Sequence, residues 1–257
     1  MNKTYTINAI IGDYMRDHLL DIVQHTHGLG VIDLVKITGT DSETQLEALA
    51  EDRSVIVQAK FKGVVAEFVG TFGMPNLGKL NTILNIPEYK ENAQISASTQ
   101  DKEGVKIPVG VHFENKTGDF KNDYRFMSAE IINDKLKTVK FKGVKWNVDI
   151  VPTNNSIQRL KFQASANSEE NTFLAKTENG ELKFFFGDHS SHAGNFVFQT
   201  GVSGTLSKAW AWPVGVVISI LSLPGDKTFK ISDEGAAMIT VDSGIAEYNY
   251  ILPAQTK

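Results

Sequence analysis

Apolar and polar residues alternate with a period of two along much of the chain, which predicts β-strands that bury one face and expose the other. The pattern is clear in residues 55–61, 145–151 and 159–164. The residues predicted to face the core in these segments are Val55, Val57, Ala59, Phe61, Trp146, Val148, Ile150, Leu160, Phe162 and Ala164. One solvated face per strand is typical of antiparallel sheets, so the sequence predicts a fold dominated by such sheets.

A two-residue turn is predicted at Asn179 and Gly180, which lie between the strand-like runs 172–178 and 181–186. The Asn-Gly pair is a strong hairpin signal because both turn positions require a positive φ. We therefore expect these two strands to be antiparallel neighbours.

Four segments have helical spacing instead, namely residues 13–27, 75–84, 128–141 and 214–223. Each contains or adjoins a residue suited to one helix end: Gly28 after the first, Pro75 at the start of the second, Ser128 as a cap of the third and Pro213 before the fourth. The rows predicted to be buried in the first three are Met15, Leu19, Ile22 and Val23, then Leu77, Leu80, Ile83 and Leu84, then Ile132, Leu136 and Val139. The fourth segment is rich in β-branched residues, which also permit a strand.

The predicted elements divide into two similar halves. Each half has a strand, a helix, four strands, a short helix and further strands, which indicates an internal duplication of architecture. The polar, glycine-containing stretch 114–123 is the predicted linker. We therefore predict an α+β protein with an N-terminal domain at 1–113, a connecting segment at 114–123 and a C-terminal domain at 124–257.

Composition narrows the class of protein. The chain has 257 residues, no cysteine and a net charge of −4. The lack of cysteine excludes disulfides and thiolate chemistry and agrees with a reducing compartment such as the cytoplasm. The longest apolar stretch, 209–223, contains Pro213 and is too short to cross a bilayer, so no membrane association is expected. The negative charge excludes a surface that is basic throughout, and DNA binding would need locally segregated positive charge.

Residues 73–79 have the G-x-x-x-x-G-K spacing of a phosphate-binding loop. Leu80 stands where such a loop needs a Ser or Thr hydroxyl for Mg²⁺, and the predicted antiparallel sheets do not supply the parallel framework of that loop. A loop that enters a short helix is therefore the favoured interpretation, and nucleotide binding is not.

Histidine pairs occur at His25 and His27 and at His189 and His192, but no third metal ligand is identifiable in the sequence. No Ser-His-Asp arrangement stands out either, and Glu169 and Glu170 lie in a polar loop. Solvated histidines are the favoured interpretation. We therefore expect no metal centre, no cofactor and no catalytic residue, and a protein that is not an enzyme.

Positive charge gathers on and after the third predicted helix. The cluster consists of Lys135, Lys137, Lys140, Lys142 and Lys145. Such a run is usually a solvated face, and the alternative is a surface that contacts phosphates.

Two segments resemble the sliding DNA clamp family of polymerase processivity factors, and in particular the two-domain trimeric clamps of tailed bacteriophages. Residues 67–96, EFVGTFGMPNLGKLNTILNIPEYKENAQIS, resemble the strand, short inner helix and following strand of a clamp domain. Residues 226–255, DKTFKISDEGAAMITVDSGIAEYNYILPAQ, are similar to the final strands and apolar-Pro tail of clamps. The order of elements extends the resemblance over nearly the whole chain.

The resemblance implies clamp-type domains with antiparallel sheets outside and two helices each inside, joined as a homotrimeric ring. It also implies that the ring encircles double-stranded DNA through phosphate contacts and binds a DNA polymerase and a clamp loader. The positions that would contact phosphates are Arg16, Lys79, Lys135, Lys137, Lys142 and Lys208. Acidic residues share these helices at Asp13, Asp17, Asp21 and Asp134, which is a departure from a strongly basic lining.

The resemblance further implies an exposed apolar groove that binds partner peptides near the connection between domains and the C-terminal tail. The matching positions are Pro108, Val109, Val111, Tyr250, Leu252 and Pro253. Tyr250 and Leu252 fit equally well as the inward face of a last strand. A non-catalytic, β-rich phage structural or ligand-binding protein is the competing hypothesis for the whole chain.

Overall fold

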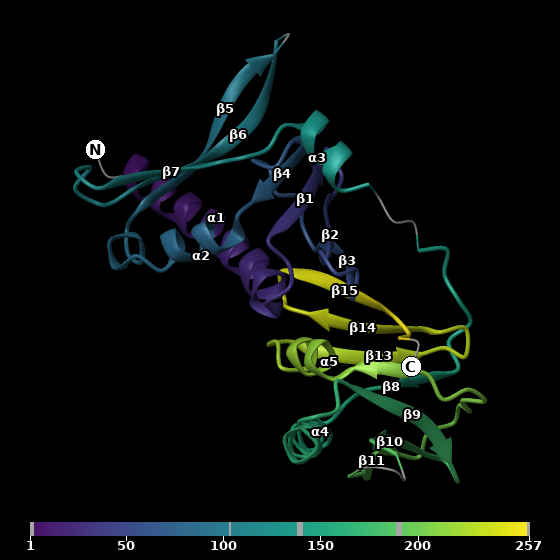
Figure 1. Ribbon diagram of the computed structural model, residues 1–257. Helices are drawn as coiled ribbons and strands as arrows, with labels where there is room; N and C mark the ends of the chain where they lie inside the picture. The colour runs from purple at the N-terminus through teal and green to yellow at the C-terminus, as the bar shows by residue number, and fades with distance from the viewer. Residues whose placement is uncertain (1–2, 103, 138–140, 189–191, 256–257) are drawn as a thin grey trace. The chain divides into compact units, whose positions relative to one another are not determined.

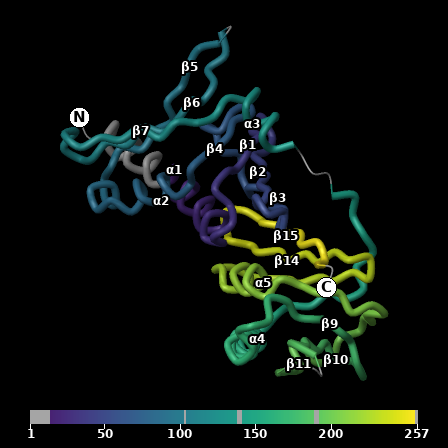
Figure 2. The backbone as a smooth tube through the Cα atoms, viewed as in Figure 1, coloured from purple at the N-terminus to yellow at the C-terminus, as the bar shows by residue number. Residues whose placement is uncertain are grey.

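The computed structural model describes the backbone of residues 3–102, 104–137, 141–188 and 192–255, with side chains from residue 14 onward (Figures 1 and 2). The chain forms two compact units. The N-terminal unit comprises Met1–Glu51, Gln58–Thr138 and Gly244–Ala246, and the C-terminal unit comprises Asp52–Val57, Val139–Ser243 and Glu247–Lys257.

The N-terminal unit combines helices with two sheets, whose strand orders are β4-β1-β2-β3 and β5-β6-β7. Strand β1 pairs antiparallel with β2 and β4, and β6 pairs antiparallel with β5 and β7. The elements are α1 (Lys3–His25), β1 (Leu34–Gly39), β2 (Thr44–Leu49), β3 (Ile56–Phe61), β4 (Gly70–Pro75), α2 (Leu77–Leu84), β5 (Gln94–Lys102), β6 (Val105–Glu114), β7 (Lys121–Arg125) and α3 (Ala129–Lys135), with short 3₁₀ turns at His27–Leu29 and Pro87–Tyr89.

The C-terminal unit repeats this arrangement, with strand orders β12-β9-β10-β11 and β15-β14-β13-β8. Its elements are β8 (Val148–Ile150), α4 (Asn154–Ala166), β9 (Thr172–Glu178), β10 (Glu181–Phe186), β11 (Gly194–Thr200), β12 (Ala211–Pro213), α5 (Val214–Leu221), β13 (Asp226–Ile231), β14 (Ala236–Asp242) and β15 (Ala246–Pro253). The order α1-β1-β2-β3-β4-α2-β5-β6-β7 corresponds element by element to α4-β9-β10-β11-β12-α5-β13-β14-β15. The duplication predicted from the sequence is therefore present in the fold.

The repeat extends to a small backbone contact. Gly73 of β4 forms a bridge with Met127, two residues after β7, and Ala211 of β12 forms a bridge with Gln255, two residues after β15. In both units the chain that leaves the last strand thus borders the strand that precedes the second helix. A shared detail of this kind supports a common architecture for the two halves.

The pattern of alternation located several strands correctly. Val55, Val57, Ala59 and Phe61 are all buried. Strands β9 and β10 end and begin beside the predicted turn, where Asn179 and Gly180 have φ of 51° and 76°. The hairpin is therefore confirmed, and its turn has the positive φ angles that this residue pair accommodates.

The apolar rows of three predicted helices are also buried. In α1 the row Met15, Leu19, Ile22 and Val23 faces the core, in α2 the row Leu77, Leu80, Ile83 and Leu84, and in α5 Val217 and Ile220. The fourth segment is a helix, α5, rather than a strand. Helix α2 begins later than predicted, because Pro75 ends β4 and Asn76, with φ 55°, caps the helix by accepting a hydrogen bond from the Lys79 amide.

The prediction of a strand at 159–164 is wrong, because these residues belong to helix α4. Thr153 caps α4 by accepting a hydrogen bond at 3.0 Å from the Ser156 amide, and Ile157 and Leu160 form the buried row. Phe162, predicted to face inward, is 64% exposed. Strand β8 is also shorter than the predicted 145–151, and Trp146 lies outside it and is half-buried.

The third predicted helix and the predicted linker also need correction. Helix α3 ends at Lys135 because Leu136 has non-helical backbone angles, although Ile132 and Leu136 are buried as expected. Val139 lies outside the described residues. Residues 114–123 are not a linker between domains: they form the turn between the paired strands β6 and β7, and the N-terminal unit continues beyond them to Thr138.

Candidate nucleic-acid interface

Each unit presents one pair of packed helices. Helix α1 packs against α2 in the N-terminal unit, and α4 packs against α5 in the C-terminal unit. Helix α3 packs instead on strand β4, where Ile132 covers Gly73 so closely that a Cβ atom on this glycine would lie 2.9 Å from Ile132 Cδ1. The second helix pair therefore consists of α4 and α5, and α3 is not part of it.

Helices α2, α4 and α5 contain no acidic residue. Their three basic residues are Lys79 on α2 and Arg159 and Lys161 on α4. Most of the exposed positions are neutral polar groups, such as Thr82, Gln158 and Ser165. Such a surface is free of repulsion toward phosphates and offers few strong contacts, which suits mobile binding of a nucleic acid backbone.

Helix α1 differs from the other three. Asp17 is exposed on it, and Asp21 is buried beside His25, with 3.2 Å between Asp21 Oδ1 and His25 Nδ1. Arg16 is half-buried and its Nη2 donates a hydrogen bond to the Leu84 carbonyl oxygen at 3.2 Å. Arg16 therefore links α1 to the end of α2, a role that the sequence did not predict for it.

Lys79 is held in place by the cap of α2. The Asp33 carboxylate accepts a hydrogen bond from the Gly78 amide at 3.1 Å, and the Asn76 side chain accepts one from the Lys79 amide. These contacts satisfy the first amide groups of the helix. An anion at this end would thus meet the exposed Lys79 side chain rather than free backbone amides.

Side chains of α4 reach the edge strand of the neighbouring sheet. Arg159 Nη1 donates to the Val197 carbonyl at 3.0 Å, and Gln163 Nε2 donates to the Asn195 carbonyl at 3.3 Å. The Arg159 guanidinium also lies 5.4 Å from the centre of the Phe196 ring. Together with Phe162, these residues line an open groove of about 580 Å³ between α4 and β11.

The remaining cations proposed for DNA contact lie outside the helix pairs. Lys135 is the last residue of α3, Lys137 follows that helix, and Lys142 lies in the irregular segment before β8. All three are exposed, but the expectation that they lie on a helix lining a pore is wrong because α3 ends early and packs on β4. Lys208 is exposed before β12, with its Nζ 5.7 Å from the Trp210 ring centre, and Lys140 lies outside the described residues.

The residues proposed for partner binding do not form an exposed groove. Val111, Tyr250 and Leu252 are completely buried, so they are core residues. Tyr250 and Leu252 lie on the inward face of β15, as the alternative interpretation predicted. Pro108 is buried and Val109 half-buried, and both belong to β6 rather than to a connection between domains, while Pro253 is exposed at the end of β15.

The other motifs of the sequence carry no site in the part of the chain that the structure describes. Gly73 lies within β4 and pairs with Lys36, so residues 73–79 are a strand end and a helix start rather than a phosphate-binding loop. No group of three metal-ligating side chains occurs among the described residues. His192 is exposed, and His189 lies outside those residues. Nor does any described helix combine the length and apolar character needed to cross a membrane.

The cations of α4 were missed by sequence reasoning, which had assigned that segment to a strand. The signal was present in the Thr153 cap, which is followed by thirteen residues without Gly or Pro. The spacing of Ile157 and Leu160 is also helical. Alternation of Leu160, Phe162 and Ala164 was the weaker of the two patterns, because a helix of this length needs only a narrow buried row.

Two units of one topology, each with a helix pair backed by antiparallel sheets, define an α+β fold of the PCNA type. The solved structures that share it include A. fulgidus PCNA bound to the C-terminal region of FEN-1, with a TM-score of 0.67, 11% sequence identity and 96% of each chain covered. They also include PCNA from Thermococcus kodakaraensis, with a TM-score of 0.61, 10% identity, and 95% of this chain and 97% of that chain covered. No family model matches the sequence, and the search of curated proteins found no match. The fold class predicted from the sequence is thus confirmed.

Proposed function

We propose that this protein is a DNA sliding clamp: a non-catalytic homotrimeric ring that encircles double-stranded DNA and tethers a replicative DNA polymerase. Two units per chain would give a ring of six, placed on DNA by a clamp loader. Partners would include proteins that dock through a terminal segment, as FEN-1 does on PCNA in one of the similar structures. The resemblance to phage clamps would place the ring in the cytoplasm of an infected host.

The observation that carries this proposal is the absence of acidic residues from α2, α4 and α5. Asp and Glu account for 30 of the 257 residues. The three helices have 8, 13 and 8 residues, so an even distribution would place about three acidic residues in them. A clamp needs a lining that attracts phosphates without reading bases, and the neutral polar faces with Lys79, Arg159 and Lys161 meet this requirement.

Edge strands supply a means of joining copies. Strand β11 ends the four-stranded sheet of the C-terminal unit, and β7 ends the three-stranded sheet of the N-terminal unit. Exposed Phe162 lies on α4, which lines the groove along β11. Pairing of β11 in one copy with β7 in the next would continue the sheets from copy to copy and bury the Phe162 side chain. Backbone amides of β7 would then replace Arg159 and Gln163 at the β11 carbonyls.

The absence of cysteine allows a direct test of this contact. A double variant, Asn195→Cys with Asp123→Cys, places one thiol on β11 and one on β7. Oxidation should yield covalent trimers and no larger species, because a closed ring has no free ends. A control pair, Asn195→Cys with Ser96→Cys, moves the second thiol to β5 and should yield only uncrosslinked chains. Uncrosslinked chains in both cases, at concentrations where light scattering gives a trimer mass, would contradict the β7–β11 contact.

The function itself is tested by retention on DNA and by polymerase run length. With its polymerase and loader, the protein should lengthen products on a primed circular template. The loaded protein should remain on closed circular duplex DNA and slide off after the circle is cut. A protein that is a stable monomer at high concentration, and that leaves run length unchanged with its own polymerase and loader, is not a clamp.

A further inference from the structure

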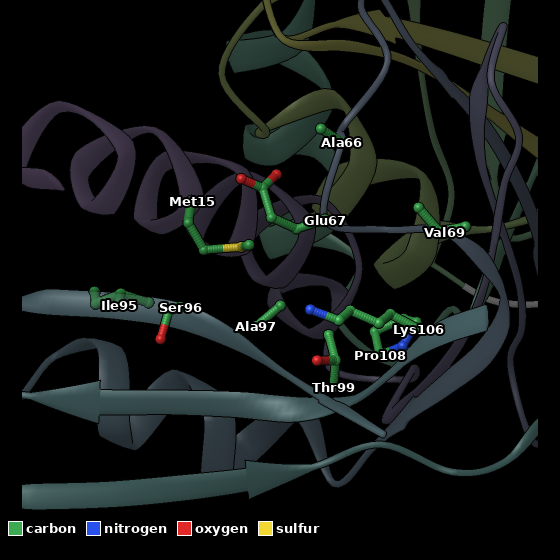
Figure 3. Close-up of a pocket in the computed structure, with 10 residues that line it drawn as sticks. All are labelled: Met15, Ala66, Glu67, Val69, Ile95, Ser96, Ala97, Thr99, Lys106 and Pro108. Carbon is green, nitrogen blue, oxygen red and sulfur yellow. The ribbon is translucent and has the colours of Figure 1, made fainter. Parts of the chain in front are cut away.

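A pocket of about 330 Å³ lies in the N-terminal unit, between α1, the segment that joins β3 to β4, and the β5–β6 hairpin (Figure 3). None of the roles proposed above uses this pocket as a whole. Its lining residues are Met15, Ala66, Glu67, Val69, Ile95, Ser96, Ala97, Thr99, Lys106 and Pro108.

The pocket runs along the edge of strand β5. Ile95, Ser96 and Ala97 all line it, although neighbouring side chains on a strand point to opposite faces (Figure 3). A cavity that meets consecutive residues therefore views the strand from its side, where backbone amide and carbonyl groups point outward. Strand β5 is the end strand of its sheet and pairs only with β6 among the described residues.

The C-terminal unit shows what this edge can hold. There β8 pairs with β13, the counterpart of β5, through Ile150 opposite Phe229 and Val148 opposite Ile231. Val148 and Ile150 of the added strand are buried. A strand at this position therefore buries its alternate apolar side chains, and the described strands of the N-terminal unit include none that occupies it.

The chemistry of the pocket indicates an apolar ligand group with a hydrogen-bond donor. Met15, Val69 and Pro108 supply apolar walls. Oxygen Oε2 of Glu67 is buried and has no hydrogen-bond partner among the described residues. A buried carboxylate oxygen of this kind requires a donor, and a cationic donor gives the strongest bond. Val69 on the pocket wall is 43% exposed, and Val105, beside Lys106, is 56% exposed.

We propose that this edge and pocket bind an extended peptide segment of a partner protein. The peptide backbone adds to β5 as a strand, one apolar side chain enters the pocket beside Met15, and an adjacent Lys or Arg side chain donates to Glu67. The site lies within the N-terminal unit. It therefore needs neither a ring nor DNA and stands independently of the proposed clamp function.

The test uses NMR of full-length protein in which the methionine methyl groups are labelled with ¹³C. The Met15 methyl reports on the pocket, and Met238 on β14 of the C-terminal unit is an internal control. The probe is acetyl-Ser-Val-Leu-Arg-Val-Ser-amide, compared with a peptide in which Glu replaces Arg and with one whose alternate backbone amides are N-methylated. We expect saturable shifts of Met15 alone, weakened about tenfold by the Arg-to-Glu change and abolished by N-methylation.

A charge variant separates specific binding from general attraction. Glu67→Gln should remove most of the preference for the Arg peptide, whereas Glu91→Gln, at an exposed position outside the pocket, should leave it unchanged. The proposal is overturned if Met15 does not respond at millimolar peptide, or if the N-methylated peptide binds equally well. It is also overturned if the Arg preference survives in Glu67→Gln, or if Met15 shifts with protein concentration alone, which would mean that a second copy fills the pocket.

Discussion

The guanidinium of Arg16 on α1 donates a hydrogen bond to the carbonyl oxygen of Leu84, the last residue of α2, across 3.2 Å. The last carbonyl groups of a helix lack partners within the helix, and a positive charge there also interacts favourably with the helix dipole. A residue that the resemblance to clamps assigned to DNA thus serves as a brace between two helices.

Replacing Arg16 with Met should loosen α2. The substitution retains much of the apolar stem and removes the hydrogen bond, so the free energy of unfolding should fall by about 1 kcal/mol. Hydrogen exchange should accelerate in residues 77–84 and stay unchanged in α5, its counterpart in the other unit. Unchanged exchange in α2, together with weaker DNA retention, would instead favour a phosphate contact for Arg16.

A side chain at Gly39 should disrupt the N-terminal unit. A Cβ atom on this residue would overlap the Phe68 carbonyl oxygen, which belongs to rigid backbone. Gly39→Ala should therefore lower stability by about 3 kcal/mol or more, as measured by urea unfolding. Gly63→Ala is the matched control, because a Cβ there meets no atom within 4 Å. Equal stability of the two variants would contradict the close approach of Gly39 to Phe68.

Asp233 should make stability depend on pH. Burial alone would raise the pKa of Asp233, but hydrogen bonds from the Ser207 hydroxyl and from the amides of Ser207 and Lys208 lower it below its ordinary value of 3.8. The unfolded chain then takes up the proton at a higher pH than the folded chain does. The stabilisation is therefore complete well above pH 3.8 and disappears as the pH falls through the lowered folded pKa.

The Asp233→Asn variant should consequently be less stable than the parent protein at about pH 6 and nearly equal to it at the most acidic pH at which both remain folded. Trp210 is a convenient fluorescent reporter because its Nε1 donates to the Asp233 carbonyl oxygen at 2.8 Å. Asp149→Asn, at an exposed position on β8, should show no comparable difference. A gap between Asp233→Asn and the parent protein that does not narrow toward acid pH would show that the carboxylate charge is not what stabilises this loop.

The helix-pair cations should govern DNA retention more than the cations near α3 do. We expect the double variant Lys79→Ala, Lys161→Ala to weaken retention and to reduce the salt slope by about 0.9 for each phosphate that is no longer neutralised. The double variant Lys135→Ala, Lys137→Ala removes the same charge outside the helix pairs and should have the smaller effect. The reverse ranking would instead assign the phosphate contacts to the lysines on and after α3.

Phe162 should stabilise the contact between copies without stabilising the unit itself. Its side chain is 64% exposed, so Phe162→Asp should change the unfolding free energy of a monomer by only about 0.5 kcal/mol. The same change should shift the trimer to monomers in light scattering, because it places a charge in the surface that would be buried between copies. An unaltered trimer would exclude Phe162 from the interface.

Much of the fold could be predicted because local patterns carry it. The Asn179 and Gly180 turn needs only the positive φ that these residues tolerate, and the rows of α1 and α2 repeat at helical spacing whatever the surroundings. The segment 159–164 shows where this reasoning fails. Its alternating residues fit a strand, but the energy gained by burying Ile157 and Leu160 on one helix face outweighs the exposure of Phe162.

The amino-acid sequence by itself determined the antiparallel strands, most of the helices, the duplication and the shortage of acid on three helices, since each depends on neighbours along the chain. Tertiary structure decided which helices pair, because pairing depends on packing between residues far apart in sequence. Ile132 on Gly73 draws α3 onto β4, and Arg16 reaches Leu84 across sixty-eight positions. The same long-range packing buried Val111, Tyr250 and Leu252 in the cores and left an open strand edge at β5.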